Sequence, residues 1–306
     1  MRVGVSGWRY APWRGAFYPS TLRQADELAY LASHLPTVEI NGTFYSLQSP
    51  ASFTAWRDAT PAGFVFAVKG PRYLTHILRL KQFERPLANF LASGVFNLGE
   101  KLGPILWQFP PNLRFDLDRF EPFLAMLPRD TTAALALARR RDARMTGRAR
   151  LAIDAPRRMR HAIEVRNETF LDARFVELLR RYGVALVIAD TGGKWPEPTD
   201  ITADFLYLRL HGATELYRSR YSDANLLAWA LRIQAWRSGR RANGDKPIVD
   251  IEPSFAPRDV YCYFDNTDKL HAPPNARRLM ELLKSGSPDS DEPARPVEIS
   301  VTRSAV

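Results

Sequence analysis

The amino-acid sequence predicts a single α/β domain that folds as a (β/α)8 barrel of TIM type with a parallel sheet. Its 306 residues match the length of one such barrel with insertions. Eight short segments rich in apolar and β-branched residues alternate with longer amphipathic segments. That alternation is typical of βαβ units, and eight repeats favour a closed barrel over an open doubly wound sheet, which is the alternative.

The expected elements follow one another in strand–helix order. The strands are expected at 2–7, 37–41, 64–69, 104–108, 161–166, 184–189, 205–211 and 259–265. The helices are expected at 22–34, 50–58, 81–93, 118–127, 172–182, 222–238 and 274–284. Hydrophobic residues make up 45% of the chain, which is enough to build the large core that a barrel requires.

Local signals mark the ends of several expected helices. Ser49 and Pro50 stand at the start of one helix, and Ser222 stands at the start of another. A hydroxyl that accepts from the first turn and a proline in that turn both favour helix initiation. Gly183 follows the helix at 172–182, where a left-handed residue is expected.

The strand–helix order breaks at two connections. Residues 191–198 contain two glycines and two prolines, which predict an irregular loop in place of a full helix after the sixth strand. The long, arginine-rich connection 128–160 predicts a helix near 131–142 followed by irregular chain. We expect the barrel domain to cover 1–284 and the polar segment 285–306 to be a disordered tail.

Composition limits where the protein works and what it binds. The net charge of +10 and the pI of about 9.9 favour anionic partners, although an arginine-rich coding bias is the alternative explanation. The lone Cys262 cannot form an internal disulfide, which fits a reducing compartment. A strand pattern directly after Met1 leaves no room for a signal peptide, and no apolar run approaches the ~20 residues of a membrane span. We therefore expect a cytoplasmic protein without membrane contact, and the sequence predicts no oligomeric state.

Alternation along the strands places polar side chains toward the barrel axis. In the second strand Val38 and Ile40 share one face, whereas Glu39 and Asn41 share the other. The same pattern recurs in 64–69, 161–166 and 205–211. Because active sites of these barrels form at the C-terminal ends of the strands, we expect a polar site at that mouth.

These positions define the predicted site. The residues assigned to catalysis are Glu39, Lys69, Glu164 and His211. The residues assigned to substrate binding are Trp8, Tyr10, Asn41, Tyr45, His76, Gln108, Arg166, Asp190, Arg209, Tyr217, Asp265 and Asn266. Burial and charged neighbours can tune a carboxyl toward neutral pH, so Glu39 or Glu164 would serve as general base or acid. Lys69, Arg166, Arg209 and His211 would bind an anion or stabilise developing negative charge.

An internal ion-pair network that only fills the barrel is the alternative to a functional site. The acidic residues at the strand ends are roughly matched by basic ones. Buried ion pairs contribute little net stability, because the cost of desolvating them rivals their attraction. Several of them gathered at one mouth therefore favour function.

The near balance of charge also bears on cofactors. A divalent-metal site would show an excess of histidine, aspartate and glutamate, and no His-x-x-x-His or Cys-x-x-Cys spacing occurs. No cofactor is implied and no metal ligand is assigned, although a divalent metal stays an open alternative. The phosphate-binding glycine motifs and the Gly-x-Ser-x-Gly elbow of hydrolases are absent from the sequence.

The first loop combines aromatic residues with arginines. Its five aromatics are Trp8, Tyr10, Trp13, Phe17 and Tyr18. They could stack on a base or a sugar ring, or they could form a hydrophobic lid on the barrel rim. Cys262 lies in the middle of an expected strand and is predicted to belong to the core.

Eight short stretches carry one family pattern. They are Gly-Trp-Arg-Tyr at 7–10, Val-Glu-Ile-Asn at 38–41, Phe-Val-Phe-Ala-Val-Lys at 64–69, Leu-Gly-Pro at 102–104, Gln-Phe-Pro-Pro at 108–111, Glu-Val-Arg at 164–166, Tyr-Leu-Arg-Leu-His-Gly at 207–212 and Tyr-Phe-Asp-Asn at 263–266. Together they resemble the YecE-like family, a domain of unknown function (DUF seventy-two), over residues 1–284. The resemblance implies a TIM-barrel-like fold and no established activity.

The resemblance also implies a distant likeness of fold to the xylose-isomerase-like group, which includes metal-dependent apurinic endonucleases. This sequence lacks the histidine-rich metal set of such nucleases. It departs from the family at Asp265-Asn266, where two asparagines are usual, and at Asn167-Glu168, where a histidine is common after Arg166.

Two functional hypotheses remain. The first is an enzyme with hydrolase-like or isomerase/lyase-like acid–base chemistry, acting at the mouth on a small anionic or polyhydroxylated substrate. The second is a nucleic-acid-binding protein without catalysis, which uses its basic surface and first-loop aromatics. A Schiff base on Lys69 is disfavoured, because a lysine beside carboxylates should stay protonated.

Overall fold

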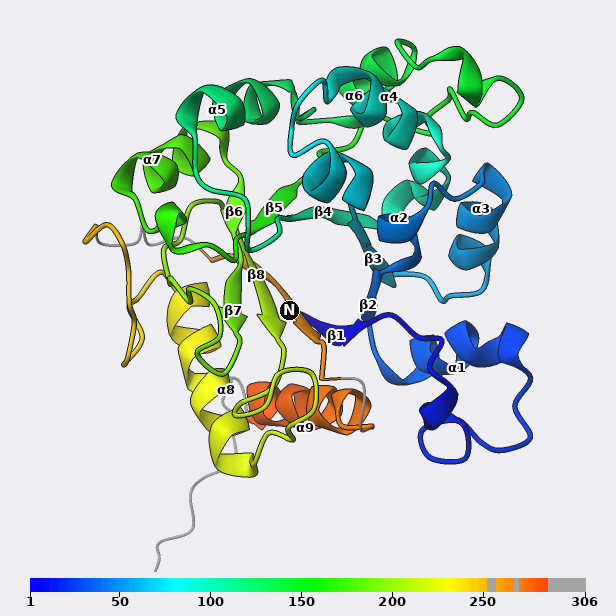
Figure 1. Cartoon of the computed structure of the whole chain (residues 1–306). Coiled ribbons are helices and arrows are strands. Elements are labelled where there is room, and N and C mark those ends of the chain that lie inside the picture. The colour runs from blue at the N-terminus through cyan, green and yellow to red at the C-terminus, as the bar shows by residue number, and fades with distance from the viewer. Residues whose placement is uncertain (252–256, 267–269, 286–306) are drawn as a thin grey trace, which may run out of the picture.

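The structure is a computed structural model that describes residues 1–251, 257–266 and 270–285. Parallel strands surround a central axis and helices pack outside them, as a TIM-like α/β barrel (Figure 1). The predicted fold class is therefore confirmed. The segment expected to form a disordered tail lies outside the described residues, apart from Ser285.

The strands form one nine-stranded sheet in the order β6-β5-β4-β3-β2-β1-β9-β8-β7. Their bounds are β1 Arg2–Ser6, β2 Thr37–Ile40, β3 Val65–Lys69, β4 Leu102–Gln108, β5 His161–Glu164, β6 Ala185–Leu186, β7 Ile188–Asp190, β8 Phe205–Leu210 and β9 Asp259–Phe264. Each neighbouring pair is parallel.

The sixth predicted strand is divided into two short strands, which accounts for nine where eight were expected. Its first half pairs with β5 through Ala185 and its second half pairs with β8 through Ile188. Between them, the amide of Val187 donates to the carbonyl of Ile163 at 2.9 Å. One strand thus changes partner along its length and nearly closes the barrel.

Helices connect most of the strands along the outside. Their bounds are α1 Glu27–His34, α2 Gly42–Tyr45, α3 Pro50–Asp58, α4 Glu84–Ala92, α5 Leu117–Met126, α6 Thr131–Ala138, α7 Ala173–Tyr182, α8 Asp223–Arg237 and α9 Ala272–Ser285. No helix lies between β7 and β8, as the sequence predicts, and the connection 128–160 contains α6 followed by mostly irregular chain. α8 and α9 lie side by side over one part of the barrel (Figure 1).

The predicted helix ends are confirmed at the level of single hydrogen bonds. The Ser49 hydroxyl accepts from the Ser52 amide at 3.1 Å, and Ser222 forms a reciprocal capping box with Asn225. Gly183 ends α7 in the left-handed region, with φ of 57°. The short helix α2, directly after β2, was not predicted.

The helix predicted at 81–93 begins later than expected. A π-helical turn occupies Tyr73–Ile77, ahead of the helix. Arg79, Leu80 and Gln82 then adopt positive φ, which a continuous α-helix excludes. α4 therefore starts only at Glu84.

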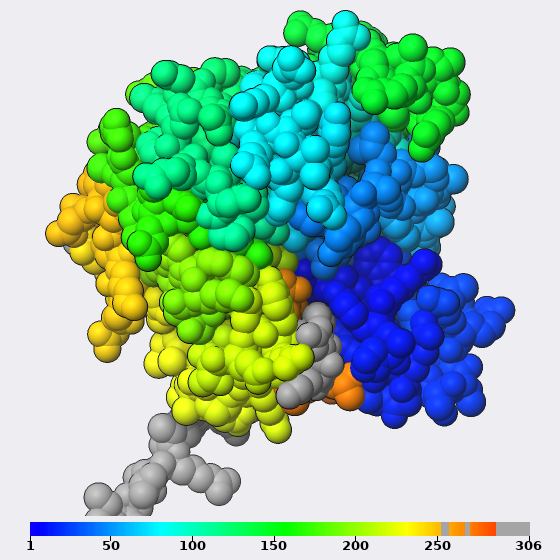
Figure 2. Space-filling model, viewed as in Figure 1, coloured from blue at the N-terminus to red at the C-terminus, as the bar shows by residue number. Residues whose placement is uncertain are grey.

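Strand alternation separates two apolar regions. Val38, Ile40 and Leu208 belong to the outer core between the sheet and the helices. The barrel interior is filled by a second cluster: Val65, Ala67, Leu106, Ala162, Ala185, Val187, Ala189, Phe205, Tyr207, Tyr261 and Tyr263. Cys262 is fully buried in the outer core, as predicted. In the space-filling view, atoms of blue, green and yellow segments meet over the middle of the molecule, where the ribbon leaves an opening (Figure 2).

The first loop packs onto the barrel and α1. Trp13 and Tyr18 are buried, and Phe17 stacks edge-on against Tyr30 of α1 at 5.5 Å between ring centroids. Trp8 is buried as well and packs edge-on against Trp56 of α3 at 5.5 Å. Of the two predicted alternatives for this loop, the hydrophobic lid accounts for these rings.

Candidate functional site

A polar cluster occupies the barrel interior at the C-terminal ends of the strands. Glu39 on β2 and Arg209 on β8 point inward, whereas their strand neighbours Ile40 and Leu208 belong to the outer core. Lys69 ends β3 and Glu164 ends β5, so both side chains reach the same level. The structure thus brings together all four residues that were assigned to catalysis, because His211 follows β8 directly.

Arg209 is the hub of this cluster and is completely buried. Its Nη2 atom lies 2.9 Å from Glu39 Oε1 and 2.9 Å from Asp265 Oδ2. Its Nη1 atom donates to Glu164 Oε2 at 2.6 Å. One guanidinium therefore neutralises carboxylates from three different parts of the barrel, with the planar fork geometry that only arginine offers.

Glu39 is held by a further set of donors. The Ser6 hydroxyl donates to Oε1 at 2.5 Å, and the Tyr207 hydroxyl donates to Oε2 at 2.7 Å. Asn41 in turn donates from Nδ2 to the Ser6 hydroxyl at 2.9 Å. These bonds fix the carboxylate in one orientation.

The charges around Glu164 and Asp265 keep both groups ionised. Burial alone would raise the pKa of the Glu164 carboxyl, but Arg166 and Arg209 outweigh it and hold that pKa well below its usual range. Burial also opposes ionisation of Asp265, yet Arg209 and then His211 lower its pKa to about 2. Of the two roles predicted for Glu164, general base or general acid, the low pKa favours the base.

Arg166 and His211 form the edge of the cluster. Arg166 contacts Glu164 Oε1 at 2.8 Å, and its guanidinium lies 3.8 Å from the centre of the Trp195 ring. Tyr217 approaches Arg166 at 3.3 Å through its hydroxyl. His211 Nδ1 lies 3.1 Å from Asp265 Oδ2, whereas its Nε2 atom is 3.6 Å from Glu164 Oε1.

Lys69 differs from the other cations because no ion pair or hydrogen bond engages its ammonium group within the described part of the chain. The nearest partner is the Phe44 ring, whose centre lies 4.3 Å from Nζ. Burial, followed by repulsion from Arg209, lowers the pKa of Lys69 to about 8. His76 lies nearby, and burial followed by repulsion from Lys69 lowers its pKa to about 4.

Two polar atoms in and beside the cluster are buried without a hydrogen-bond partner among the described residues. His211 Nε2 and Asn41 Oδ1 form no hydrogen bond within the described residues. An unsatisfied buried polar atom costs about 1–3 kcal/mol. Such atoms at the mouth are available to a bound molecule.

A cavity of about 360 Å³ adjoins the cluster at the ends of β1 and β2. Its walls include Trp8, Tyr10, Asn41 and Tyr45, which were all predicted to bind substrate. Asn41 is the link, because its side chain bonds to Ser6 and thereby to Glu39. Gln108 and His76 lie on the other side of the mouth, with 3.4 Å between their Nε2 atoms.

The predicted positions of Asp190 and Asn266 are corrected, because the structure does not bring these two residues into the cluster. Asp190 shares a face with Ile188 of the outer core and accepts from the Trp229 indole of α8 at 3.3 Å. Asn266 donates to Asn275 of α9 at 3.1 Å. Ala189 and Asp265 are the residues that point inward at these ends, so the alternation places their neighbours outside.

Three members of the cluster were absent from the predicted site. Ser6 and Tyr207 could have been found, since each occupies an inward position by the same alternation that identified Glu39 and Arg209. Trp195 comes from the irregular loop after β7, where the sequence carries no periodic signal.

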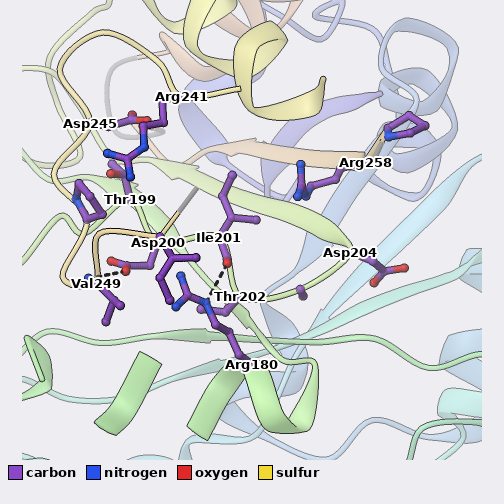
Figure 3. Close-up of a pocket in the computed structure, with 14 residues that line it drawn as sticks. Arg180, Thr199, Asp200, Ile201, Thr202, Asp204, Arg241, Asp245, Val249 and Arg258 are labelled. Carbon is purple, nitrogen blue, oxygen red and sulfur yellow. Dashed lines mark hydrogen bonds between the residues drawn. The ribbon is translucent and has the colours of Figure 1, made fainter. Parts of the chain in front are cut away.

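A second cavity, of about 380 Å³, lies at the opposite end of the barrel (Figure 3). It lies beside Asp204 and Arg258, which directly precede β8 and β9. Its polar groups are engaged in holding the chain: Asp200 accepts from the amides of Ile248 and Val249, and Arg180 donates to the carbonyl of Ile201. This cavity shares no residue with the cluster.

The described residues contain neither a metal-binding cluster nor a helix suited to crossing a membrane. Within 1–251, 257–266 and 270–285, no group of three or more His, Cys, Asp or Glu side chains is arranged to hold a metal ion. The carboxylates of the mouth are bonded to Arg209 instead. Over the same residues, none of the helices has the length and apolar character that crossing a membrane requires.

Solved structures share this architecture. A DUF72 family protein from Thermotoga maritima MSB8 superposes with a TM-score of 0.66 at 24% identity, over 92% of this chain and 98% of the other. A DUF72 family protein from Enterococcus faecalis superposes with a TM-score of 0.63 at 18% identity, over 97% and 99% of the two chains. At these identities the likeness concerns the fold.

Sequence comparisons point to the same family. The UPF0759 protein YunF of Bacillus subtilis is 28% identical over 120 residues, which span 36% of this chain and only 39% of that relative. The family model described as "Protein of unknown function DUF72" matches residues 2–297, which is nearly the whole chain. The resemblance inferred from the sequence is thereby confirmed, and the chain belongs to the DUF72 family.

Proposed function

We propose that this protein is an enzyme that performs acid–base chemistry on a small anionic or polyhydroxylated substrate at the barrel mouth. The observation that carries the proposal is a set of buried polar groups without a hydrogen bond, which surround the fully hydrogen-bonded Arg209. Arg209 satisfies the carboxylates, whereas Lys69 Nζ, His211 Nε2 and Asn41 Oδ1 form no hydrogen bond within the described residues. A network that only filled the barrel would gain stability by satisfying these groups too.

The substrate would lie in the 360 Å³ cavity and extend toward the cluster. The cavity size suits a molecule such as a sugar acid or a sugar phosphate. Trp8, Tyr10 and Tyr45 offer ring faces and edges, and Gln48 and Asn41 offer amides for hydroxyl groups. Arg9 lines the same cavity and would attract an anionic group.

The charge of each residue in the cluster limits the chemical role that the residue can take. Glu164 is ionised, so it would accept a proton or orient a neighbour, and it would not donate one. Lys69, whose pKa is lowered to about 8, would give or take a proton near neutral pH, and His211 would hydrogen-bond the substrate through Nε2, since Arg209 is fixed as a cation. Arg166 lies at the edge of the cluster and would bind negative charge on the substrate or on the transition state.

The test is a thermal-denaturation screen of the purified protein against aldonic acids, sugar phosphates and polyols. A ligand that binds only the folded protein raises Tm with the logarithm of its concentration over Kd. We expect a ligand of these classes to raise Tm, and we expect Glu164→Gln to abolish that shift. Glu121→Gln is the matched control, because Glu121 forms an exposed pair with Arg181 away from the mouth.

The result that would overturn the proposal is an unchanged ligand-dependent shift in Glu164→Gln. A screen in which none of these ligand classes moves Tm would equally count against it. Either outcome would favour the ion-pair network as a filler of the barrel.

A second candidate function is binding of single-stranded nucleic acid. Most of the first-loop aromatics predicted for this role are buried, but Tyr45 and Tyr73 expose 70% and 47% of their surfaces. Both line a cavity of about 300 Å³ together with Arg144 and Arg148, so stacking surfaces and basic groups coincide there. Binding that falls steeply with salt and is lost in Tyr45→Ala would support this function, and salt-independent or absent binding would exclude it.

A further inference from the structure

Lys69 stands out among the buried cations of the protein. Only 8% of its surface is exposed, yet its ammonium group has no counter-ion within 4 Å among the described residues. Lys101, another buried lysine, instead donates to the carbonyls of Arg57 and Thr60 at 2.6 Å each. A structural lysine is thus satisfied in this protein, and Lys69 is not.

The reason is that Arg209 engages the neighbouring carboxylates. Glu39, Glu164 and Asp265 all attract Lys69, but each accepts a short hydrogen bond from Arg209. Arg209 itself repels a proton on Lys69, and its repulsion exceeds the attraction of any single carboxylate. His76 also lies near Lys69, and its low pKa leaves that imidazole neutral.

The position of Lys69 is fixed by the strand end and by α2. The Thr43 hydroxyl donates to the Lys69 carbonyl at 2.7 Å, and the amide of the next residue, Gly70, donates to the carbonyl of Leu106 at 2.8 Å. At the end of the Lys69 side chain, Nζ lies over the face of the Phe44 ring. A rigid backbone and an apolar surface around an amine are the conditions under which a lysine serves as a nucleophile.

We propose that Lys69 is a covalent catalytic residue that captures an aldehyde or ketone substrate as a Schiff base. The proposal rests on the proposed function, since it places the substrate at the same mouth and specifies that it carries a carbonyl group. Arg166 and His211 would receive a carboxylate, phosphate or hydroxyl group on the same molecule. The substrate class is therefore a small hydroxy-aldehyde, hydroxy-ketone or 2-oxo acid.

The step balances without an added oxidant or reductant. The neutral Nζ attacks the carbonyl carbon, the C–N bond forms as the carbonyl π bond breaks, and one proton passes from the nitrogen to the oxygen to give a neutral carbinolamine. A second proton is delivered to that oxygen, and the nitrogen lone pair expels it as water, which leaves the iminium. Loss of the N–H proton from the iminium returns the second proton, so that amine plus carbonyl becomes imine plus water, with His211 as a nearby group able to relay protons and Glu164 as a nearby carboxylate able to accept one.

Lys69 stays mostly protonated at pH 7, as expected of a lysine beside carboxylates, but its neutral fraction is raised. With a pKa of about 8, roughly one in ten Lys69 side chains is neutral at pH 7. An ordinary exposed lysine is neutral in only about one molecule in three thousand at that pH. The neutral amine needed for attack is present in useful amounts at Lys69.

The test is reductive trapping of the full chain. The protein is incubated at pH 7 with glycolaldehyde, dihydroxyacetone or glyoxylate, reduced with sodium cyanoborohydride, digested, and analysed by peptide mass spectrometry. We expect an adduct on Lys69 that forms about tenfold or more faster than adducts on the exposed Lys81 and Lys194. Peptide mapping locates the adduct in the unaltered protein, so the result does not depend on whether a variant folds.

Lys69→Arg should remove this fast adduct, and Lys194→Arg should leave it unchanged. Equal labelling of all the lysines, or fast labelling that persists in Lys69→Arg, would overturn the Schiff base. The same variants tested for thermal shift with an aldonic acid, which has no carbonyl to trap, separate the two proposals. A shift that remains without any Lys69 adduct would retain the acid–base enzyme and remove covalent capture alone.

Discussion

The two halves of the barrel interior are built on the same strands and differ in chemistry. In the half nearer the N-terminal ends, Phe205, Tyr261 and Val65 fill the axis with apolar surface. In the half nearer the C-terminal ends, the axis holds Arg209 and the carboxylates bonded to it. On β8 alone, Phe205 and Tyr207 lie in the apolar cluster, and Arg209 begins the polar one.

This difference teaches how the protein divides stability and function along one axis. Packing in the apolar half stabilises the fold by about 25 cal/mol for each Å² of apolar surface buried. Burying ions in the polar half costs several kcal/mol per ion before their attraction is counted. The polar half therefore offers little net stability, and it depends on the pairing of its carboxylates with Arg209.

The largest expected effect comes from removing the hub. Arg209→Met removes the cation that carboxylates from three segments share, although Glu164 keeps Arg166 at 2.8 Å and Asp265 keeps His211 at 3.1 Å. We expect the free energy of unfolding to fall by about 3–5 kcal/mol. Lys101→Met removes a buried cation before β4, at the other end of the barrel, where only carbonyl and hydroxyl oxygens accept its hydrogen bonds. That variant should cost about 1–2 kcal/mol. Urea unfolding of both variants measures the difference.

Equal losses in the two variants would contradict the comparison. They would mean that removing the cation of the charged cluster costs no more unfolding free energy than removing a single lysine hydrogen-bonded to carbonyl groups. A loss in Arg209→Met that shrinks as the pH falls below about 4 would instead support it, because the carboxylates of the variant, which Arg209 no longer stabilises, then take up protons.

The second effect is on stability in acid. The folded-state pKa of Asp265 is lowered to about 2, so its contribution is complete above the unfolded pKa of about 4 and is lost as the pH falls toward 2. The size of this contribution is about 2 kcal/mol, and Glu164, whose pKa is also lowered, adds to it in the same direction.

Asp265→Asn should therefore flatten the dependence of unfolding free energy on pH between about 4 and 2. Asp118→Asn, at an exposed position, is the matched control and should leave the profile unchanged. Parallel profiles for the unaltered protein and Asp265→Asn would show that the Asp265 pairing contributes nothing to acid stability.

The smallest effect compares two tyrosines at the boundary of the halves. Tyr207 and Tyr263 lie on neighbouring strands with 5.2 Å between ring centroids. The Tyr207 hydroxyl donates to the charged Glu39, whereas Tyr263 shares a hydrogen bond with the neutral Thr37 hydroxyl. Tyr207→Phe should cost about 1.5–3 kcal/mol and Tyr263→Phe about 0.5–1.5 kcal/mol, as measured by urea unfolding. A larger loss in Tyr263→Phe than in Tyr207→Phe would mean that the boundary between the apolar and the polar half does not lie at Tyr207.

The sequence determined the barrel and the inward face of most strands, because both follow from local rules. A period of two residues separates Glu39 from Ile40 and Arg209 from Leu208 wherever the strand is regular. The same rule, applied one residue further, excludes Asp190 and Asn266 and includes Ser6. Helix ends at Ser49, Ser222 and Gly183 also depend only on neighbours in the chain.

Only the tertiary structure decided how the charges pair. Whether Glu39, Glu164 and Asp265 engage Arg209 or Lys69 depends on distances between strands that lie far apart in the sequence. That choice shifts the pKa values of Glu164, Asp265 and Lys69, since electrostatic energy depends on separation and burial and not on order along the chain. It leaves Glu164 ionised and Lys69 without an ion pair in the part of the chain that the structure describes, and tertiary packing brings Trp195 from an irregular loop onto Arg166.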